Sequence, residues 1–384
     1  MYWKYTLFEL KLLISNKKHL LIGLLLLLFF PLLFIQQTNE THITVKEQKE
    51  AEKEVVDSAI YQMEAIQDSS PEFQAMHENL LQQLSTLNMQ IYYINENREL
   101  FIEEGYRLHD LRLEAHEQGN TGIPEDNIYP KEKVESDLDM LSYLDQHNLP
   151  IETNPNTTSQ FLVTSVDMIS GLLLLTIVLI SGSEILTMER RHETVMSGIP
   201  ITFFKKMIVK VKIHFLYIMT TLVLGLCIGG WLANNQVGFG SFQQPITIYQ
   251  NGDMTIVPVS QYLTYMFLAI IVTTLLILIL SVLLNLLFNN AFVNLIAGLG
   301  IFLIPMLLTP ALEYVPFLRP FTYVDMSKVL SGELAETLNQ PGLDYGYAMI
   351  WLTVLAVVTL IVIYINQKLN FYSLKQLFRI EAKN

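Results

Sequence analysis

The pair His192-Glu193 is the part of the sequence that comes closest to a catalytic motif. A helical zinc-protease site needs a second histidine one turn after the first, so that two imidazoles bind the metal while the glutamate acts as the base. Met196 occupies the position of that second histidine. The sequence therefore excludes this type of zinc site, and its single cysteine, Cys227, excludes a cysteine-rich one.

Motifs for nucleotide or acyl chemistry are also absent from the sequence. None of the 18 glycines precedes a lysine, so no P-loop can hold a nucleotide, and no Gly-x-Ser-x-Gly segment marks a serine hydrolase. The net charge of −13 argues against nucleic acid as a partner, because binding phosphates requires a basic surface. We expect no catalytic residue, cofactor or metal in this chain. An intramembrane enzyme stays an alternative, because catalytic residues need not be close in sequence.

Three polar residues in or beside long apolar runs are candidates for lining a translocation path: Asp167, Asn285 and Asn294. Ionisable groups within membrane segments are costly, and are functional hypotheses by default. The alternative is that the Asp167 carboxylate reaches the membrane interface, while the two amides join helices or lie in a loop.

The stretch 183–212 combines acidic, basic and turn-forming residues in a definite order. A basic loop with an ordinary turn would account for its lysines, but not for acidic residues, arginines, a threonine and a proline in succession. We therefore take it as the candidate functional loop. Its candidate residues are Glu184, Glu189, Arg190, Arg191, Glu193, Thr194 and Pro200.

Long apolar runs are expected to position these residues, because a helix needs about 20 apolar residues to cross a bilayer. Prolines near the end of one run predict a kink or an early helix end. No small-residue cleavage site follows the first run, so we interpret it as an uncleaved anchor rather than a signal peptide. The sequence thus predicts an all-α polytopic membrane protein. Its six expected spans are 20–35, 161–185, 213–232, 262–288, 291–309 (with Pro305 and, just beyond it, Pro310) and 347–365.

Basic residues predict the orientation of these spans. Lysines and arginines occur in an amphipathic lead-in (1–19), in the loop 186–212 and in the tail 366–384, which fall on one side of a six-span protein. Because basic residues favour the cytoplasmic side, both termini are expected there. The composition is leucine-rich and poor in cysteine, which favours a bacterial plasma membrane. The expected external segments are 36–160, 233–261 and 310–346.

The external segment 36–160 carries most of the acidic residues. It holds 8 basic and 25 acidic residues, a net charge of −17, which leaves +4 for the rest of the chain. Mostly heptad spacing of apolar residues predicts a long helix across 71–118, with further helices at 56–66 and 134–144. We expect a helical hairpin or coiled coil. Its acidic surface is either only solvated or faces a cationic substrate or partner.

The other external segments are shorter. In 233–261, β-branched residues alternate on both sides of Asn251-Gly252, a dipeptide that favours a tight hairpin turn. This pattern predicts a β-hairpin at 246–257 that acts as a lid or spacer between spans. The segment 310–346 is expected to be a loop with short helices.

The candidate loop resembles the loop after the second span in permease subunits of exporter-type (type-two) ABC transporters. There a glutamate is followed by Glu-Arg, a Gly-Thr pair and a proline that begins the next helix. Glu184, Glu189-Arg190, Thr194 and Pro200 match this order, whereas Glu193 stands where glycine is usual. The lead-in and the stretch 316–333 are also similar to that family, and the resemblance does not cover 36–160.

This resemblance implies that the loop acts as a coupling helix, which docks into a groove on a separate cytoplasmic ATPase. That partner would bind ATP and Mg²⁺, so this chain would not itself be an enzyme. A second permease chain, identical or paralogous, would complete the export path. The substrate would be a peptide, an antimicrobial or another amphiphile, and 36–160 could meet it or an accessory protein. A competing hypothesis is a membrane scaffold or sensor whose external coiled coil binds a partner.

Overall fold

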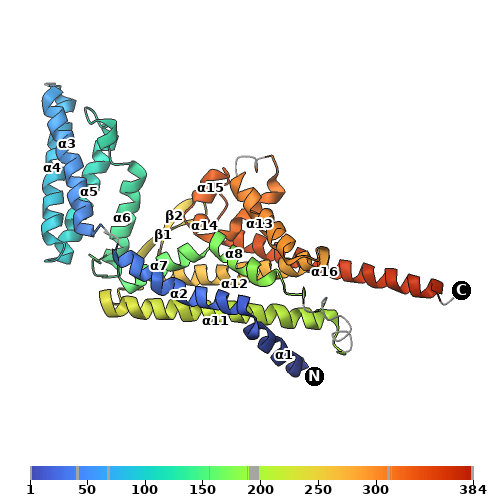
Figure 1. Cartoon of the computed structure of the whole chain (residues 1–384). Coiled ribbons are helices and arrows are strands. Elements are labelled where there is room, and N and C mark those ends of the chain that lie inside the picture. The colour runs from blue at the N-terminus through green and yellow to red at the C-terminus, as the bar shows by residue number, and fades with distance from the viewer. Residues whose placement is uncertain are drawn as a thin grey trace.

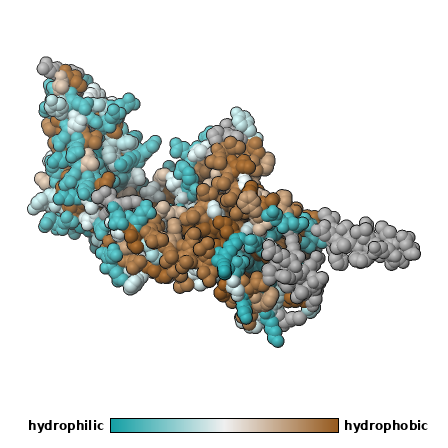
Figure 2. All heavy atoms as spheres, in the orientation of Figure 1, coloured by the Kyte–Doolittle hydropathy of each residue, from teal (hydrophilic) through white to brown (hydrophobic). Residues whose placement is uncertain are grey.

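The computed structural model describes residues 2–39, 43–66, 70–154, 156–187, 189, 199–308, 312 and 314–381. Within them, four helices are long and apolar enough to cross a membrane. Hydrophobic residues cover this part of the surface in Figure 2. The chain is therefore an α-helical membrane protein. The four helices are α2 (Lys17–Asn39), α11 (Phe203–Val237), α12 (Val259–Leu287) and the Tyr345–Lys368 part of α16 (Tyr345–Glu381), as Figure 1 shows.

Two of the six expected spans are not single long helices. Segment 161–185 is divided into α7 (Thr158–Ile169) and α8 (Leu172–Gly182), which are bent by 57°. Segment 291–309 contains α13 (Ala291–Leu307), an apolar helix of 17 residues that ends shortly after Pro305. The described part of the chain thus has four helices of membrane length, or five such units when α7 and α8 count as one span.

The break between α7 and α8 depends on Gly171 and on a carboxylate from a distant part of the chain. Gly171 has a φ of 68°, which residues with a side chain rarely adopt. A Cβ atom at this position would lie 2.8 Å from Cγ of Asp325. The Asp325 carboxylate therefore lies at the start of α8, where unpaired N–H groups and the helix dipole favour a negative charge.

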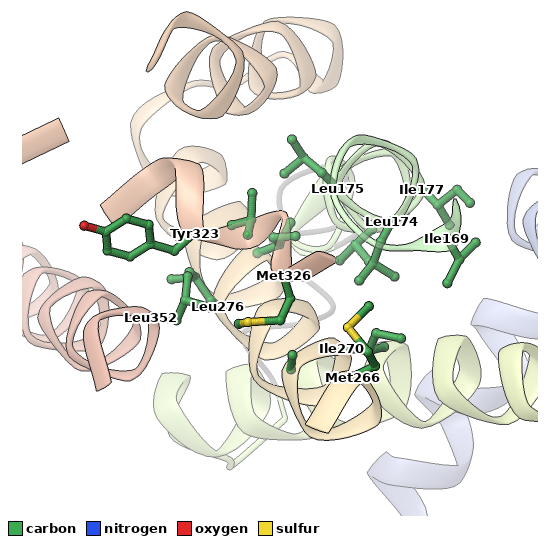
Figure 3. Close-up of a cluster of buried hydrophobic side chains, with 14 of the residues drawn as sticks. Ile169, Leu174, Leu175, Ile177, Met266, Ile270, Leu276, Tyr323, Met326 and Leu352 are labelled. Atoms are coloured by element: carbon green, nitrogen blue, oxygen red, sulfur yellow. The ribbon is translucent and has the colours of Figure 1, made fainter. Parts of the chain in front are cut away.

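The core of the membrane part is built around α12, which contacts α7, α8, α11, α13 and α16. In Figure 3, Met266, Ile270 and Leu276 of α12 lie among buried side chains from α7, α8, α14 (Met326–Leu330) and α16. Beside this core, α2 packs along α11. Gly225 of α11 allows close approach there, because a Cβ atom would lie 2.5 Å from the carbonyl oxygen of Leu26.

Residues predicted to lie outside the membrane form a helical bundle, which we call the α3–α6 bundle. It extends from one end of the long helices in Figure 1, and Figure 2 shows that its surface is mainly hydrophilic. Within it α3 packs on α4, α4 on α5, and α5 on α6. Its elements are α3 (Val45–Ile66), α4 (Pro71–Tyr93), α5 (Arg98–Glu117), the 3-10 helix η1 (Glu125–Asn127) and α6 (Lys131–Gln146).

The long helix predicted across 71–118 is wrong, because the chain reverses at residues 94–97 and α4 and α5 form an antiparallel pair. Asn97 caps the start of α5, because its Oδ1 accepts a hydrogen bond from the backbone N–H of Leu100 (3.1 Å). Most apolar residues that gave the heptad pattern share one core, in which Leu87 of α4 and Leu108 of α5 are fully buried, while Ile94 and Phe101 belong to a second cluster beside the reversal. A helical hairpin is present, but α4 and α5 form it inside the segment that was expected to be one helix, with α3 and α6 on its flanks.

The predicted β-hairpin is confirmed. Strand β1 (Pro245–Gln250) pairs with β2 (Asp253–Pro258) in antiparallel fashion, with Ile246 opposite Val257. Asn251 and Gly252 both have positive φ values, 56° and 94°, as a type I′ turn requires. The later expected loop contains the short helices η3 (Pro316–Val324), α14 and α15 (Glu333–Thr337).

His109 makes the stability of the α3–α6 bundle sensitive to pH. The residue is buried in α5, and its Nδ1 has no hydrogen-bond partner. Burial, together with the positive charges of Arg112 and Lys49, lowers the pKa of His109 from 6.5 to about 3. At pH values between these two pKa values, His109 therefore binds a proton in the unfolded chain but not in the folded bundle. The free energy of unfolding must fall as the pH falls through this window.

We expect acidification from about pH 7.5 to about pH 5 to destabilise the bundle by about 2 kcal/mol through His109 alone. Calorimetry of the full chain in lipid nanodiscs, at both pH values, measures this change. The variant His109→Gln should lose most of the pH dependence. His147→Gln, which changes an exposed histidine directly after α6, should keep it. Equal pH dependence in wild type and His109→Gln would contradict the assignment.

Candidate functional site

The end of α8, directly before the candidate loop, is held by two amides from other helices. The helix ends at Gly182, and its last carbonyl groups have no partner within the helix. Asn285 of α12 donates from Nδ2 to the carbonyl oxygens of Gly182 (3.1 Å) and Ser281 (2.8 Å). Asn294 of α13 donates from Nδ2 to the carbonyl oxygen of Ser183 (3.2 Å). The end of α8 is therefore fixed to both α12 and α13.

Side chains from α2 and α11 bind the same turn. Lys18 donates from Nζ to Oγ of Ser183 (3.0 Å) and forms an ion pair with Oε1 of Glu184 (3.6 Å). Oγ of Ser181 is hydrogen-bonded to Nδ1 of His214 (3.0 Å) and lies 3.4 Å from Nδ1 of His19. Five elements thus meet at residues 181–184. We call this group the 181–184 cluster; it comprises Lys18, His19, Ser181, Gly182, Ser183, Glu184, His214, Ser281, Asn285 and Asn294.

The lead-in helix α1 (Tyr2–Ser15) continues this network. Glu9 and Lys210 of α11 form a buried ion pair with an Oε1–Nζ distance of 2.9 Å. Tyr5 donates from its hydroxyl to Oε1 of Glu189 (3.4 Å) and packs with Leu13 in a small core that α11 completes. The lead-in is therefore docked on α11, in contact with a residue of the candidate loop.

A cavity of about 280 Å³ lies between α1, α2, α11 and the end of α8. Acidic, basic and imidazole groups line it together with apolar side chains. The cavity thus borders both the Glu9–Lys210 ion pair and the 181–184 cluster. Its polar lining residues are Glu9, Ser15, Asn16, His19, Glu184, Thr187, Lys210 and His214.

The structure brings together some of the candidate residues and separates others. Glu184 joins Asn285 and Asn294 in the 181–184 cluster. Glu189 contacts α1 instead, and Pro200 is exposed just before α11 begins at Phe203. Arg190, Arg191, Glu193 and Thr194 lie outside the described residues.

Asp167 lies apart from the two asparagines. It is in α7, where its Oδ1 accepts a hydrogen bond from the hydroxyl of Tyr262 in α12 (2.6 Å). Asp167 thus ties the first helix of the bent pair to α12, as Asn285 ties the end of the second.

Sequence reasoning missed Lys18, His19, Lys210 and His214 as members of this region. The sequence does contain a signal for two of them: Lys210 and His214 are one helical turn apart at the start of an apolar helix, so they lie on the same face. Such residues at the end of an expected span also fit plain interfacial anchors. Their partners on α1 and α8 are distant in sequence, so the pairing becomes visible only in the fold.

No protein family, curated protein or solved structure matches this chain. Among the described residues, no group of three or more histidine, cysteine or acidic side chains could hold a metal ion. A function must therefore be argued from the arrangement of the residues themselves.

We expect Lys210→Met to destabilise the protein by about 3–5 kcal/mol, because it leaves the Glu9 carboxylate buried without its partner. The double variant Glu9→Leu/Lys210→Met removes both charges and should recover most of this loss. Lys212→Met changes an exposed lysine of the same helix and is the matched control. Thermal unfolding in lipid nanodiscs measures all three. A double variant no more stable than Lys210→Met would contradict a buried ion pair at this position.

Proposed function

We propose that this chain is the permease subunit of an exporter-type ABC transporter, and that a separate ATPase drives it through the loop 186–212. The observation that carries the proposal is the anchoring of two acidic residues of the loop motif. Glu184 is bound to Lys18 of α2, and Glu189 is bound to Tyr5 of α1. The lead-in and the loop, two of the three parts that resemble such permeases, thereby form one contact region.

The proposed topology has six spans, formed by α2, the α7–α8 pair, α11, α12, α13 and α16. Figure 1 supports it, because α1, the start of α11 and the far end of α16 all lie at the end of the long helices opposite the α3–α6 bundle. The end with α1 carries the basic segments, and the end with the α3–α6 bundle carries the acidic domain. Both termini and the loop are then cytoplasmic, and the bundle is outside a bacterial plasma membrane.

In the proposed mechanism, the ATPase binds the loop and moves it when ATP is bound and hydrolysed. ATP and Mg²⁺ belong to that partner. The contacts of Glu184 with Lys18 and of Asn285 with Gly182 carry the displacement into α2, α8 and α12. A bent helix pair can change its angle at Gly171, so movement at one end can open or close the path. A second permease chain completes the path, and a peptide or another amphiphile is the proposed substrate class.

We expect an ATPase to co-purify with the tagged chain from its native membrane. Glu184→Gln and Lys18→Met each remove the ion pair, and should lower the ATPase activity of the complex by about fivefold, equivalent to about 1 kcal/mol. Glu99→Gln changes an exposed acid of the α3–α6 bundle and should leave activity unchanged.

Two outcomes of this experiment would reject the permease assignment. One is recovery of the chain without an ATPase. The other is a co-purified ATPase whose activity is unchanged by both Glu184→Gln and Lys18→Met. A partner bound through the α3–α6 bundle alone would instead support a scaffold or sensor.

A further inference from the structure

The α3–α6 bundle contains a cavity of about 420 Å³ between α3, α5 and the segment around η1. This volume lies in the range of about 300–1,000 Å³ that is typical of small-molecule sites. Gln48, Ala51 and Val55 line the cavity and are exposed, so it reaches the surface. Its walls are mainly apolar. Among the residues that form them are Val56, Leu80, Ala115, Ile123, Ile128 and Pro130.

Arg112 is the charged group of this cavity. Its side chain is only 3% exposed and donates from Nη2 to Oε2 of Glu52 (2.8 Å). The guanidinium lies over the ring of Tyr129, 3.8 Å from its centroid. Its other nitrogens, Nε and Nη1, have no hydrogen-bond partner and almost no exposed surface. Leaving a buried charged donor unpaired costs about 1–3 kcal/mol or more, so an acceptor supplied by a ligand would be strongly favoured.

Neighbouring side chains hold Arg112 in place. Lys49 forms an ion pair with the same Glu52 (3.1 Å), and the hydroxyl of Tyr129 donates to Asp137 (2.6 Å). Burial raises the pKa of Glu52, but attraction to Lys49 and Arg112 outweighs it, so the pKa is below its ordinary value. The carboxylate therefore stays ionised at neutral pH and fixes one edge of the guanidinium.

The charge around the cavity differs from that of the surrounding domain. Residues 36–160 have only 8 basic residues, yet Lys49, Arg112 and Lys133 gather around Glu52 and Tyr129. Asp126 also lines the cavity, and Asp137 is bound to Tyr129. Three cations and three carboxylates thus surround this apolar cavity, so the local charge is balanced inside an otherwise acidic bundle, and Arg112 keeps unpartnered nitrogens. This combination selects ligands with an apolar body and an anionic end.

We propose that this cavity binds a small amphiphile whose carboxylate or phosphate accepts a hydrogen bond from Arg112, once a small shift of the guanidinium opens one of its unpartnered nitrogens to the cavity. The apolar body of the ligand packs against Val56, Leu80 and Ile123. The proposal does not depend on transport, because it concerns binding within the bundle alone. Sequence reasoning pointed instead to a cationic partner for the acidic surface. The two ideas concern different parts of the same domain.

The experiment uses 8,8,8-trifluorooctanoate as the probe, with fluorine NMR of the full chain in phosphatidylcholine nanodiscs. Empty nanodiscs give the contribution of bilayer partitioning. We expect saturable binding to the wild type and at least tenfold weaker binding to Arg112→Lys, which keeps the charge beside Glu52 but loses the guanidinium donors. Arg107→Lys, at an exposed position of α5, should bind as the wild type does.

A second pair of variants tests the cavity without touching Arg112. Ala51→Phe places a ring at the exposed rim and should block the probe, whereas Ala65→Phe, at an exposed site of α3 outside the cavity, should not. Octyl phosphate is tested as a competitor and as a second ligand. Failure of both anions to bind would overturn the proposal. The proposal would also be overturned if wild type, Arg112→Lys and Ala51→Phe bound trifluorooctanoate with equal affinity. The same holds if the wild type bound trifluorooctylamine as tightly as trifluorooctanoate.

Discussion

The membrane part of this protein depends on satisfying the backbone groups at the end of a broken helix. A buried carbonyl group needs a hydrogen-bond donor from the protein, and the last carbonyl groups of a helix have none within that helix. Asn285 and Asn294 supply these donors to Gly182 and Ser183, from two different helices. Because the amides reach across from α12 and α13, the positions of three helices are set together. The first residues of the loop 186–212 follow directly after this fixed turn, so their positions are set by it as well.

Buried charge pairs add specificity to this arrangement at some cost in stability. Removing Glu9 and Lys210 from water is expensive, and a well-packed apolar pair in their place could be as stable. Their pairing nevertheless sets the position of α1 along α11, which apolar contacts alone define less sharply. Arg112 and Glu52 play a similar part in the α3–α6 bundle, where they connect α5 to α3. In both places the charged pair joins elements that are far apart in sequence.

Local sequence predicted those features that local physics decides. Apolar runs marked the long helices, and Asn251-Gly252 marked the hairpin because its turn needs two positive φ values. The reversal at 94–97 escaped prediction, because apolar spacing is the same whether one helix continues or two helices fold onto a shared core. The break at Gly171 escaped as well, since a glycine in an apolar run is common and Asp325, which lies against it, comes from a distant segment. In the 181–184 cluster, the order of acidic residues in the loop motif pointed to Glu184. It did not point to Lys18, because this partner is distant in sequence.

The α3–α6 bundle contacts the membrane part of the protein through more than the chain connections at its two ends. Its last helix, α6, borders the cavity through Lys133 and contacts both strands of the β-hairpin. Beyond α6, Glu152 accepts a hydrogen bond from the backbone N–H of Ser241, and Gln244 donates to the carbonyl oxygen of Pro150 (2.8 Å). These contacts tie the base of the bundle to the segment between α11 and α12. A ligand that displaces α6 would therefore act directly on the connection between two long helices, whose other ends meet the 181–184 cluster.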